Sequence, residues 1–305
     1  IKNFDLKQYD WRPQRRDVIE FMAHKRDYFN IYRTGDNLYL QGRDGQEVSI
    51  FDQFSNQGNN QHYINEFRFT DKTLTAADIK ALFEAGAHFG HKTSRWHPKM
   101  APYIHSKRQD SHIIDLAKTV EALNVALPII SKTVASGKQV LFVGTKKQAK
   151  DITRQAAEAV GQPYVTNRWV GGMLTNVTTT TAQIKKLKDL ERRMASGDLE
   201  KRYNKLEVQR YQEEIDSLNF KYGGIKDLNG KPGLVLVLDI LADNNALREA
   251  KTLGVPVIGI VDTNANPDLV DYPIPANDDA IKSLQLMLDY FSAAVNEGKA
   301  TKEEN

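Results

Sequence analysis

The chain of 305 residues contains no cysteine. Disulfide bridges and thiolate metal sites are therefore excluded. No apolar run approaches the roughly 20 residues that a transmembrane helix needs, and the first residues lack the apolar core of a signal peptide. These absences predict no membrane-spanning segment and suit a cytoplasmic protein.

The motifs of several enzyme classes are also missing. The chain has no P-loop of the form G-x-x-x-x-G-K-[ST], no G-x-G-x-x-G after a strand and no G-x-S-x-G elbow. Nucleotide hydrolysis and serine catalysis are therefore poorly supported. The composition is that of an ordinary globular protein, with 40% hydrophobic and 27% charged residues. Because 42 basic residues nearly balance 39 acidic ones, the grouping of charge is more informative than its sum.

Compact apolar runs alternate with helical patterns over much of the chain. QVLFVG, GLVLVLDI and VPVIGIVDT have the near-continuous apolar character of strands buried on both faces. Helical patterns follow them, and buried strands alternating with helices indicate a mainly parallel sheet. The sequence thus predicts an α/β domain over residues 73–181 and 224–297.

Residues 182–223 interrupt this domain with two charged helical patterns. Their apolar positions recur every three or four residues, and Ser196-Gly197-Asp198 separates them. This spacing predicts an antiparallel coiled-coil hairpin that projects as an arm, because it has too few apolar positions for a core. The first stripe is Ile184, Leu187, Leu190 and Met194; the second is Leu206, Tyr211, Ile215, Leu218 and Tyr222.

The two ends of the chain differ from its middle. Residues 1–72 read as a small β-rich extension, with a possible helix over residues 17–29 and a hairpin that turns at Asp44-Gly45. A natural extension, an engineered fusion and the joining of separate sequences all remain open as its origin. Residues 298–305 are expected to form a disordered tail.

The stretch AGAHFGHKTSRWHPKMAPYI gathers histidines, cations and aromatic residues. A zinc site at His88, His91 and His97 is one reading, but no carboxylate nearby completes a tetrahedral set. A catalytic reading with Ser94, Ser106 or Ser111 lacks an orienting acid. The reading that accounts for most of the residues is a surface for phosphate and unpaired bases. Its members are His88, His91, Lys92, Arg95, Trp96, His97, Lys99, Lys107 and Arg108.

Two further segments offer anion-binding groups. Thr145 could cap a helix that begins with Lys146 and Lys147, and a helix N-terminus favours phosphate. The stretch TNRWVGGMLTNVTTTT repeats the pairing of a cation with an aromatic residue and adds small and amide residues that suit close backbone approach. Its candidates are Arg168, Trp169, Gly171, Gly172 and Asn176.

Seven blocks in one order resemble the bacterial ribosomal small-subunit protein two family. They include HFGHKTSRWHPKM, VLFVGTKKQA and NRWVGGMLTN, together with GGIKDLNGKPG and IGIVDTNANPDLVDYPIPANDDA, and the likeness runs from about Leu74 to Val295. The resemblance implies a Rossmann-like domain with a coiled-coil arm, no catalysis, no cofactor and no small-molecule substrate. It further implies binding to small-subunit (16S-type) rRNA and contact with neighbouring ribosomal proteins, including small-subunit protein one.

Two other function classes stay open. An α/β nucleotide- or magnesium-binding enzyme could use Lys146 and Lys147 for phosphate and Asp239, Asp262 and Asp268 for magnesium. Residues 35–80 resemble the closing segment of secreted calcium-binding repeat proteins. The glycine-aspartate nonapeptides that bind calcium in those proteins are missing, so no metal is carried over.

Overall fold

The computed structural model describes the backbone of residues 17–21, 29–34, 37–42, 47–50, 64–69 and 73–303, and side chains from Asp78 to Lys302. The chain forms two compact units, residues 1–80 and 81–305. The boundary falls inside helix α1 (Ala76–Glu84), later than the change expected near residue 73.

The first unit contains two three-stranded sheets. One has the order β1 (Asp17–Phe21), β5 (Ile64–Phe69), β6 (Thr73–Thr75). The other pairs β2 (Phe29–Thr34) with β3 (Asn37–Gly42) and β3 with β4 (Glu47–Ile50).

Pairing in these sheets tests two sequence predictions. The predicted hairpin is confirmed, since Leu38 pairs with Ile50 and Leu40 with Val48; its turn lies outside the described residues. The helix predicted over residues 17–29 is wrong, because residues 17–21 form a strand parallel to β5. Adjacent β-branched Val18 and Ile19 favour the extended chain there.

The second unit is built on a five-stranded sheet with the order β11 (Tyr164–Val165), β10 (Val140–Val143), β12 (Leu234–Val237), β13 (Val257–Val261), β14 (Tyr272–Pro275). All neighbouring strands are parallel. β10, β12 and β13 are buried along their whole length, as their apolar runs predict. Because the chain order reverses between β10 and β12, their carboxyl ends frame the crevice where such sheets bind ligands.

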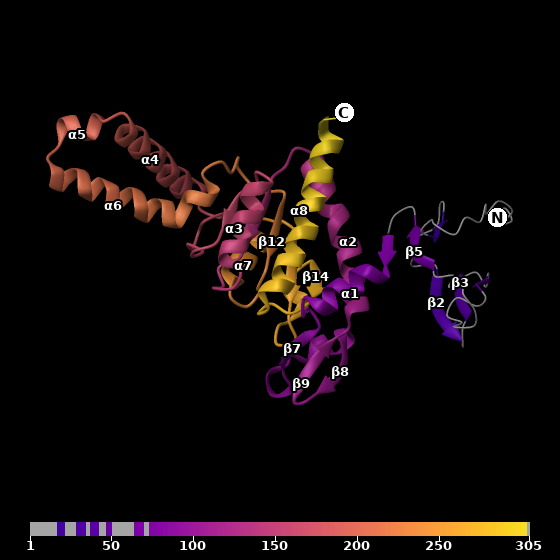
Figure 1. Ribbon diagram of the computed structural model, residues 1–305. Coiled ribbons are helices and arrows are strands. Elements are labelled where there is room, and N and C mark those ends of the chain that lie inside the picture. Colours follow the sequence, from indigo (N-terminus) through magenta and orange to yellow (C-terminus); the bar gives the residue numbers. More distant parts are fainter. Residues whose placement is uncertain are drawn as a thin grey trace. The chain divides into compact units, whose positions relative to one another are not determined.

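Helices cover this sheet (Figure 1). α2 (Leu116–Ala135) and α3 (Lys150–Ala159) both pack against α8 (Ile281–Glu303), and α7 (Asn244–Thr252) packs against β13. The α/β fold expected from the alternating pattern is confirmed. The disordered tail expected from residue 298 is wrong as far as Glu303, because α8 continues to that residue. No helix in the described residues is long and apolar enough to cross a lipid bilayer.

A small antiparallel sheet lies at one end of this unit. Its order is β7 (Phe89–Lys92), β9 (Ser111–Ile114), β8 (Ile104–Arg108), with the short 3₁₀ helices η2 (Thr93–Arg95) and η3 (Pro98–Tyr103) between β7 and β8. Gln109 and Asp110 have positive φ and form the two-residue turn between β8 and β9. We call residues 89–114 the basic module.

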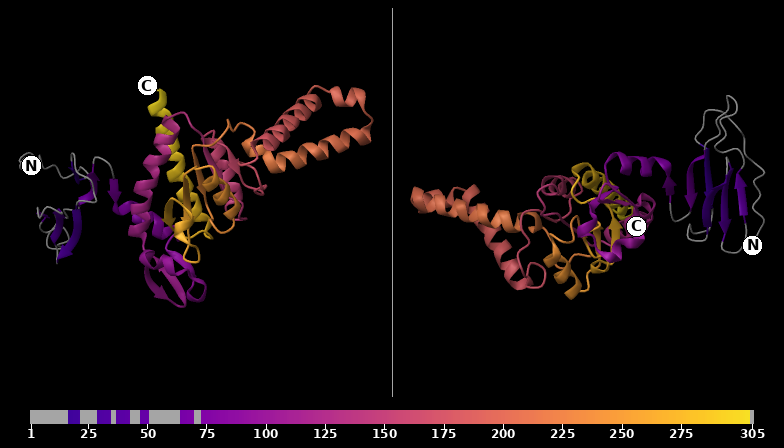
Figure 2. Two further views of the ribbon diagram at one scale, coloured as in Figure 1. Left: turned by 180° about the vertical axis from the view of Figure 1, so that it is seen from behind. Right: turned by 90° about the horizontal axis from the view of Figure 1, so that it is seen from below.

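The predicted arm is present and stands away from the sheet (Figure 2). α4 (Val177–Ala195) and α6 (Lys205–Tyr222) pack together, and the short helix α5 (Asp198–Arg202) joins them at the tip. Leu187, Leu190, Ile215 and Leu218 are buried within it, as the stripes predict. Three details differ from the prediction. Helix α5 was not expected, and α4 begins at Val177 rather than near residue 182. Leu206, expected in the apolar seam between the two helices, is 61% exposed.

Candidate nucleic-acid interface and sheet-edge cluster

The basic module is fixed to the carboxyl edge of the large sheet. The His91 amide donates to Thr263 Oγ1 over 2.8 Å, and the His97 amide donates to the Thr263 carbonyl over 2.7 Å. Asn277, after β14, donates its side-chain N–H to the Phe89 carbonyl over 2.7 Å. A Cβ at Gly90 would lie 2.5 Å from Thr263 Cγ2, so only glycine permits this approach.

Exposed cations cover the outer side of the module. Lys92, Arg95, Lys99, Lys107 and Arg108 are all exposed. Lys99 pairs with Asp268, and Lys107 lies 4.0 Å from Asp110. Within the described side chains no ion pair involves Lys92, Arg95 or Arg108, which leaves these three cations available to an external anion.

The ring side chains in and beside the module differ in exposure. Trp96 is 38% exposed and stacks at a tilt on His112, with ring centroids 5.1 Å apart. The His97 side chain accepts the Lys99 amide over 3.3 Å and thus caps η3. His88 is 8% exposed, and its ring lies 4.3 Å from that of Phe83. Its burial lowers the pKa of His88, and the rings of Phe83 and Phe89 lie beside it, so His88 is not among the exposed groups.

His91 also has partners inside the protein. Its Nδ1 lies 3.1 Å from Asp262 and its Nε2 3.4 Å from Asp279. The hydrogen bond to Asp262 raises the pKa of His91 and outweighs its burial. A cavity of about 350 Å³ opens beside it, lined by His91, Lys92, Arg95 and Asp279 among others. Cations and carboxylates thus share one hollow.

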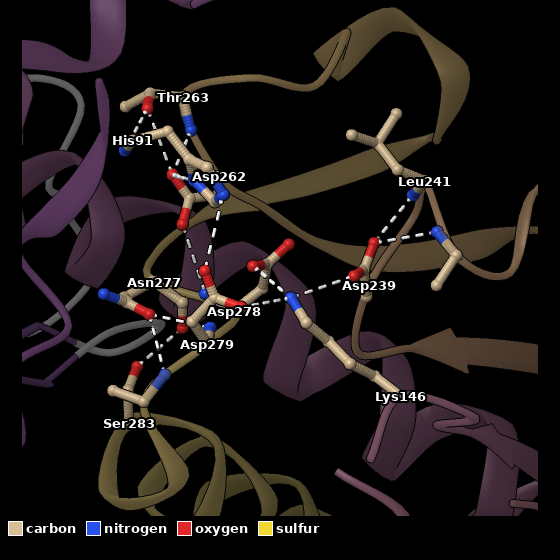
Figure 3. Close-up of polar contacts among 12 residues, drawn as sticks. His91, Lys146, Asp239, Leu241, Asp262, Thr263, Asn277, Asp278, Asp279 and Ser283 are labelled. Carbon is tan, nitrogen blue, oxygen red and sulfur yellow. Dashed lines mark hydrogen bonds and ion pairs between the residues drawn. The ribbon is translucent and has the colours of Figure 1, made fainter. Parts of the chain in front are cut away.

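Polar side chains gather where β10, β12, β13 and β14 end, and Figure 3 shows them in contact. Lys146, after β10, lies 3.1 Å from Asp239, 2.8 Å from Asp278 and 2.7 Å from Asp279. Burial alone would lower the pKa of Lys146, but these carboxylates raise it above its ordinary value. Lys146 is therefore a counter-ion to these carboxylates, and its phosphate contact stays a prediction.

The helix start expected at Lys146 is displaced as well. Thr145 donates its hydroxyl to Asp243 over 2.7 Å instead of capping a helix, and α3 begins only at Lys150. Burial, with the nearby charge of Asp239, raises the pKa of Asp243 to about 6. Lys147 is exposed. Of the predicted pair, only Lys147 presents its charge to solvent.

Burial and the charges of Asp239 and Asp262 raise the pKa of Asp278 to about 7. One ligand atom each from His91, Asp262, Asp278 and Asp279 lies within 4.8 Å of the others. A nitrogen with three carboxylate oxygens is a donor set that a divalent metal ion could accept. The structure does not assemble the expected trio of Asp239, Asp262 and Asp268, because Asp268 pairs with Lys99 at the surface.

Sequence reasoning missed Asp278 and Asp279 as members of this cluster. The signal was available, since both follow β14 at the same sheet edge where Asp239 and Asp262 follow β12 and β13.

The RWVGGMLT segment is organised by a residue far away in sequence. Glu249, on α7, accepts hydrogen bonds from the Trp169 indole N–H over 2.9 Å and from the Gly172 amide over 2.8 Å through Oε1. Its Oε2 accepts the amides of Leu174 and Thr175 over 2.9 and 3.1 Å. Trp169 is only 7% exposed, and its indole N–H is already bonded to Glu249, so this residue is not among the exposed groups of the segment.

Met173 and Leu174 of this segment are buried, whereas Arg168, Gly171 and the following Asn176 lie at the surface. Arg168 is exposed, and open space surrounds the position of a Cβ at Gly171. Gly172 has φ +82°, which only glycine adopts without strain. Asn176 caps α4 by accepting the Thr179 amide over 3.3 Å. Arg168 and Gly171 therefore offer the freest contact groups.

Comparison with known proteins agrees with this architecture. The family model "Ribosomal protein S2" matches residues 82–298. The "Small ribosomal subunit protein uS2" of Rickettsia rickettsii is 48% identical over 225 residues, 74% of this chain and 76% of the relative. The protein of the same name from Coprothermobacter proteolyticus is 44% identical over 230 residues, 75% of this chain and 85% of the relative. That of Bartonella henselae is 47% identical over 222 residues, 73% of this chain and 86% of the relative. The chain therefore belongs to the ribosomal protein S2 family of structural proteins of the small ribosomal subunit.

Proposed function

We propose that this protein binds small-subunit rRNA through the outer side of the basic module and through the Arg168–Gly171 loop, within the ribosome in the cytoplasm. The observation that carries the proposal is the group of exposed cations Lys92, Arg95 and Arg108 on one small module, none of which has an ion-pair partner among the described side chains. Phosphate oxygens are the natural partners of such cations.

Neighbouring groups extend the surface beyond these three residues. Trp96 exposes more than a third of its side chain beside Arg95, and an exposed indole can stack on an unpaired base. Lys99 and Lys107 have only exposed carboxylate partners, and such surface pairs are worth little, so phosphate can compete for these cations.

The test is the double substitution Arg95→Ala with Arg168→Ala. Both side chains are exposed, so the fold should persist while incorporation into small subunits weakens in competition with the unmodified chain. Each lost phosphate contact also reduces the salt slope of binding by about 0.7–0.9, so two contacts reduce it by roughly 1.6.

A matched control removes the same charge elsewhere. Lys132 and Lys138 are exposed at the C-terminal end of α2 and just beyond it, and their double alanine variant should compete like the unmodified chain. Equal incorporation of both double variants would refute the placement of the RNA surface.

We also propose that the protein helps to dock small-subunit protein one. Phe83 and Phe89 are 60% and 52% exposed on either side of the buried His88 ring. Exposed aromatic groups of this kind are typical of protein contacts. Phe89→Ser should release protein one from purified small subunits while this chain stays bound; retention of protein one would refute the docking role.

A further inference from the structure

A second cationic hollow lies where the arm joins the body, away from the basic module. It has a volume of about 430 Å³ and is lined by the start of α3, by β11 with the residues after it, and by the C-terminal end of α6, which is the foot of the arm. We call it the foot cleft. Four of its lining residues are cations, and two are acids: Lys150, Arg154, Lys221 and Lys226 against Asp151 and Asp216.

The cations of the foot cleft differ in what they already contact. Lys226 is committed to Glu191 over 2.7 Å, and Arg154 lies 3.5 Å from Asp151. Lys221 is exposed, and within the described side chains it has no ion pair. Lys150 has none there either, and its Nζ lies 5.6 Å from the centre of the Phe220 ring. Lys150 thus lies over the Phe220 ring, and neither Lys150 nor Lys221 has a carboxylate partner among the described side chains.

Phe220 lies outside the apolar seam of the arm. Its side chain is 51% exposed at the end of α6, whereas the neighbouring seam residues Leu218 and Tyr222 are 7% and 8% exposed. Its backbone carbonyl accepts the Asn167 side-chain N–H over 3.1 Å, which holds that turn of α6 against the residues after β11. The ring is therefore presented at a fixed place on the wall of the cleft.

The cleft is also rigid. A Cβ at Gly224 would lie 2.2 Å from the Tyr164 carbonyl oxygen, so the arm foot sits directly on β11. Asn219 donates to Glu191 over 2.8 Å and ties α6 to α4 at the same level. α3 begins at Lys150 with no side-chain cap and carries Asp151 in its first turn, so the start of this helix places a cation and a carboxylate side by side at the cleft.

We infer that the foot cleft binds one unpaired nucleotide of the RNA, its base stacked on Phe220 and its phosphate held by Lys150 and Lys221. This inference rests on the proposed function and deepens it with a second contact point. An exposed aromatic ring flanked by cations is the arrangement by which proteins hold single-stranded nucleotides without reading a base pair. A folded acidic peptide could pair with Lys150 and Lys221, but it would offer no planar group to stack on the Phe220 ring.

The experiment is ultraviolet crosslinking of small subunits that carry the full chain, followed by mass spectrometry of its peptides. The expected result is a nucleotide attached to the peptide that contains Phe220, and its loss in the Phe220→Leu variant. Because Phe220 is half exposed, leucine should leave the fold unchanged, which circular dichroism checks. Loss of one stacked base should weaken incorporation roughly fivefold or more in competition.

Charge variants give a second reading of the same site. Lys150→Gln with Lys221→Gln should weaken incorporation, whereas Lys132→Gln with Lys138→Gln, with equal charge loss, should not. Two outcomes would overturn the foot-cleft inference alone. One is a crosslink from this peptide to a protein; the other is the absence of a nucleotide on it while Arg95→Ala with Arg168→Ala still impairs incorporation. Failure of the unmodified chain to enter small subunits would overturn the proposed function and this inference together.

Discussion

Replacing Glu249 by glutamine tests how strongly one carboxylate organises the RWVGGMLT segment. The carboxylate accepts five hydrogen bonds, from the Trp169 indole, from the amides of Gly172, Leu174 and Thr175, and from the Thr175 hydroxyl. Glutamine keeps the shape but turns one oxygen into a donor. Whichever way the glutamine amide points, its NH₂ group faces at least two N–H donors, from which it cannot accept a hydrogen bond.

The magnitude follows from this count. A hydrogen bond to a charged group contributes about 1.5–3 kcal/mol, so losing two costs about 3–6 kcal/mol. Glu249 is partly exposed, and water can replace some of the lost bonds, so we expect about 2 kcal/mol. That loss would speed amide hydrogen exchange in the segment roughly 30-fold.

Hydrogen-exchange mass spectrometry on the full chain measures this effect at the peptide that spans residues 168–176, with a peptide of α2 as the internal reference. Burial opposes ionisation of Glu249, but the hydrogen bonds from Trp169, Leu174, Thr175 and Gly172 outweigh it and lower its pKa. The carboxylate therefore stabilises the segment above its unfolded pKa of about 4.3, and this stabilisation is lost as the pH falls through the lower folded pKa. The glutamine variant should lack that acid dependence. Unchanged exchange at residues 168–176 in Glu249→Gln would refute the reasoning.

Two further predictions concern the arm joint and the sheet-edge cluster. Gly224→Ala should lower the free energy of unfolding by about 2 kcal/mol or more, and with it the melting temperature, because its Cβ would lie 2.2 Å from the Tyr164 carbonyl oxygen. Gly171→Ala is the control, because open space surrounds that position. Equal melting temperatures of the two variants would contradict the close contact at Gly224. In the unmodified chain, burial and neighbouring carboxylates raise the pKa of Asp278 to about 7, so the folded state holds this proton more tightly and its stability should fall as the pH rises from about 4 through 7. Asp278→Asn should show a weaker decline across that window in thermal unfolding, and an identical pH profile would count against charge crowding at this edge.

The layout of the second unit follows from short-range patterns. Runs such as VLFV and VIGIV are apolar at every position because helices and loops cover both faces of the sheet, and the structure buries them throughout. The arm follows from the spacing of Leu187, Leu190, Ile215 and Leu218. Such signals depend on residues close in sequence, which is why they could be predicted.

The site depended more on distant partners. Lys146 and Trp169 have the residue types of an RNA contact, but Asp239 with Asp278 engages the first and Glu249 the second. These partners lie 80 to 132 positions away in the chain, and no local pattern indicates them. In contrast, Lys92, Arg95 and Arg108 remained exposed because their segment is almost free of acids.

The connection that carries the arm has a mechanical consequence. The chain leaves the sheet after the edge strand β11, runs out along α4 and returns along α6 to the central strand β12. Both ends of the arm are thus anchored at one root, and the 18 residues of α6 extend roughly 27 Å from it. Over that reach, a tilt of about 5° at the root moves the tip by roughly 2 Å. The arm therefore acts as a lever whose aim is set by the few contacts at its root, and a nucleotide wedged there would determine where its distant end points.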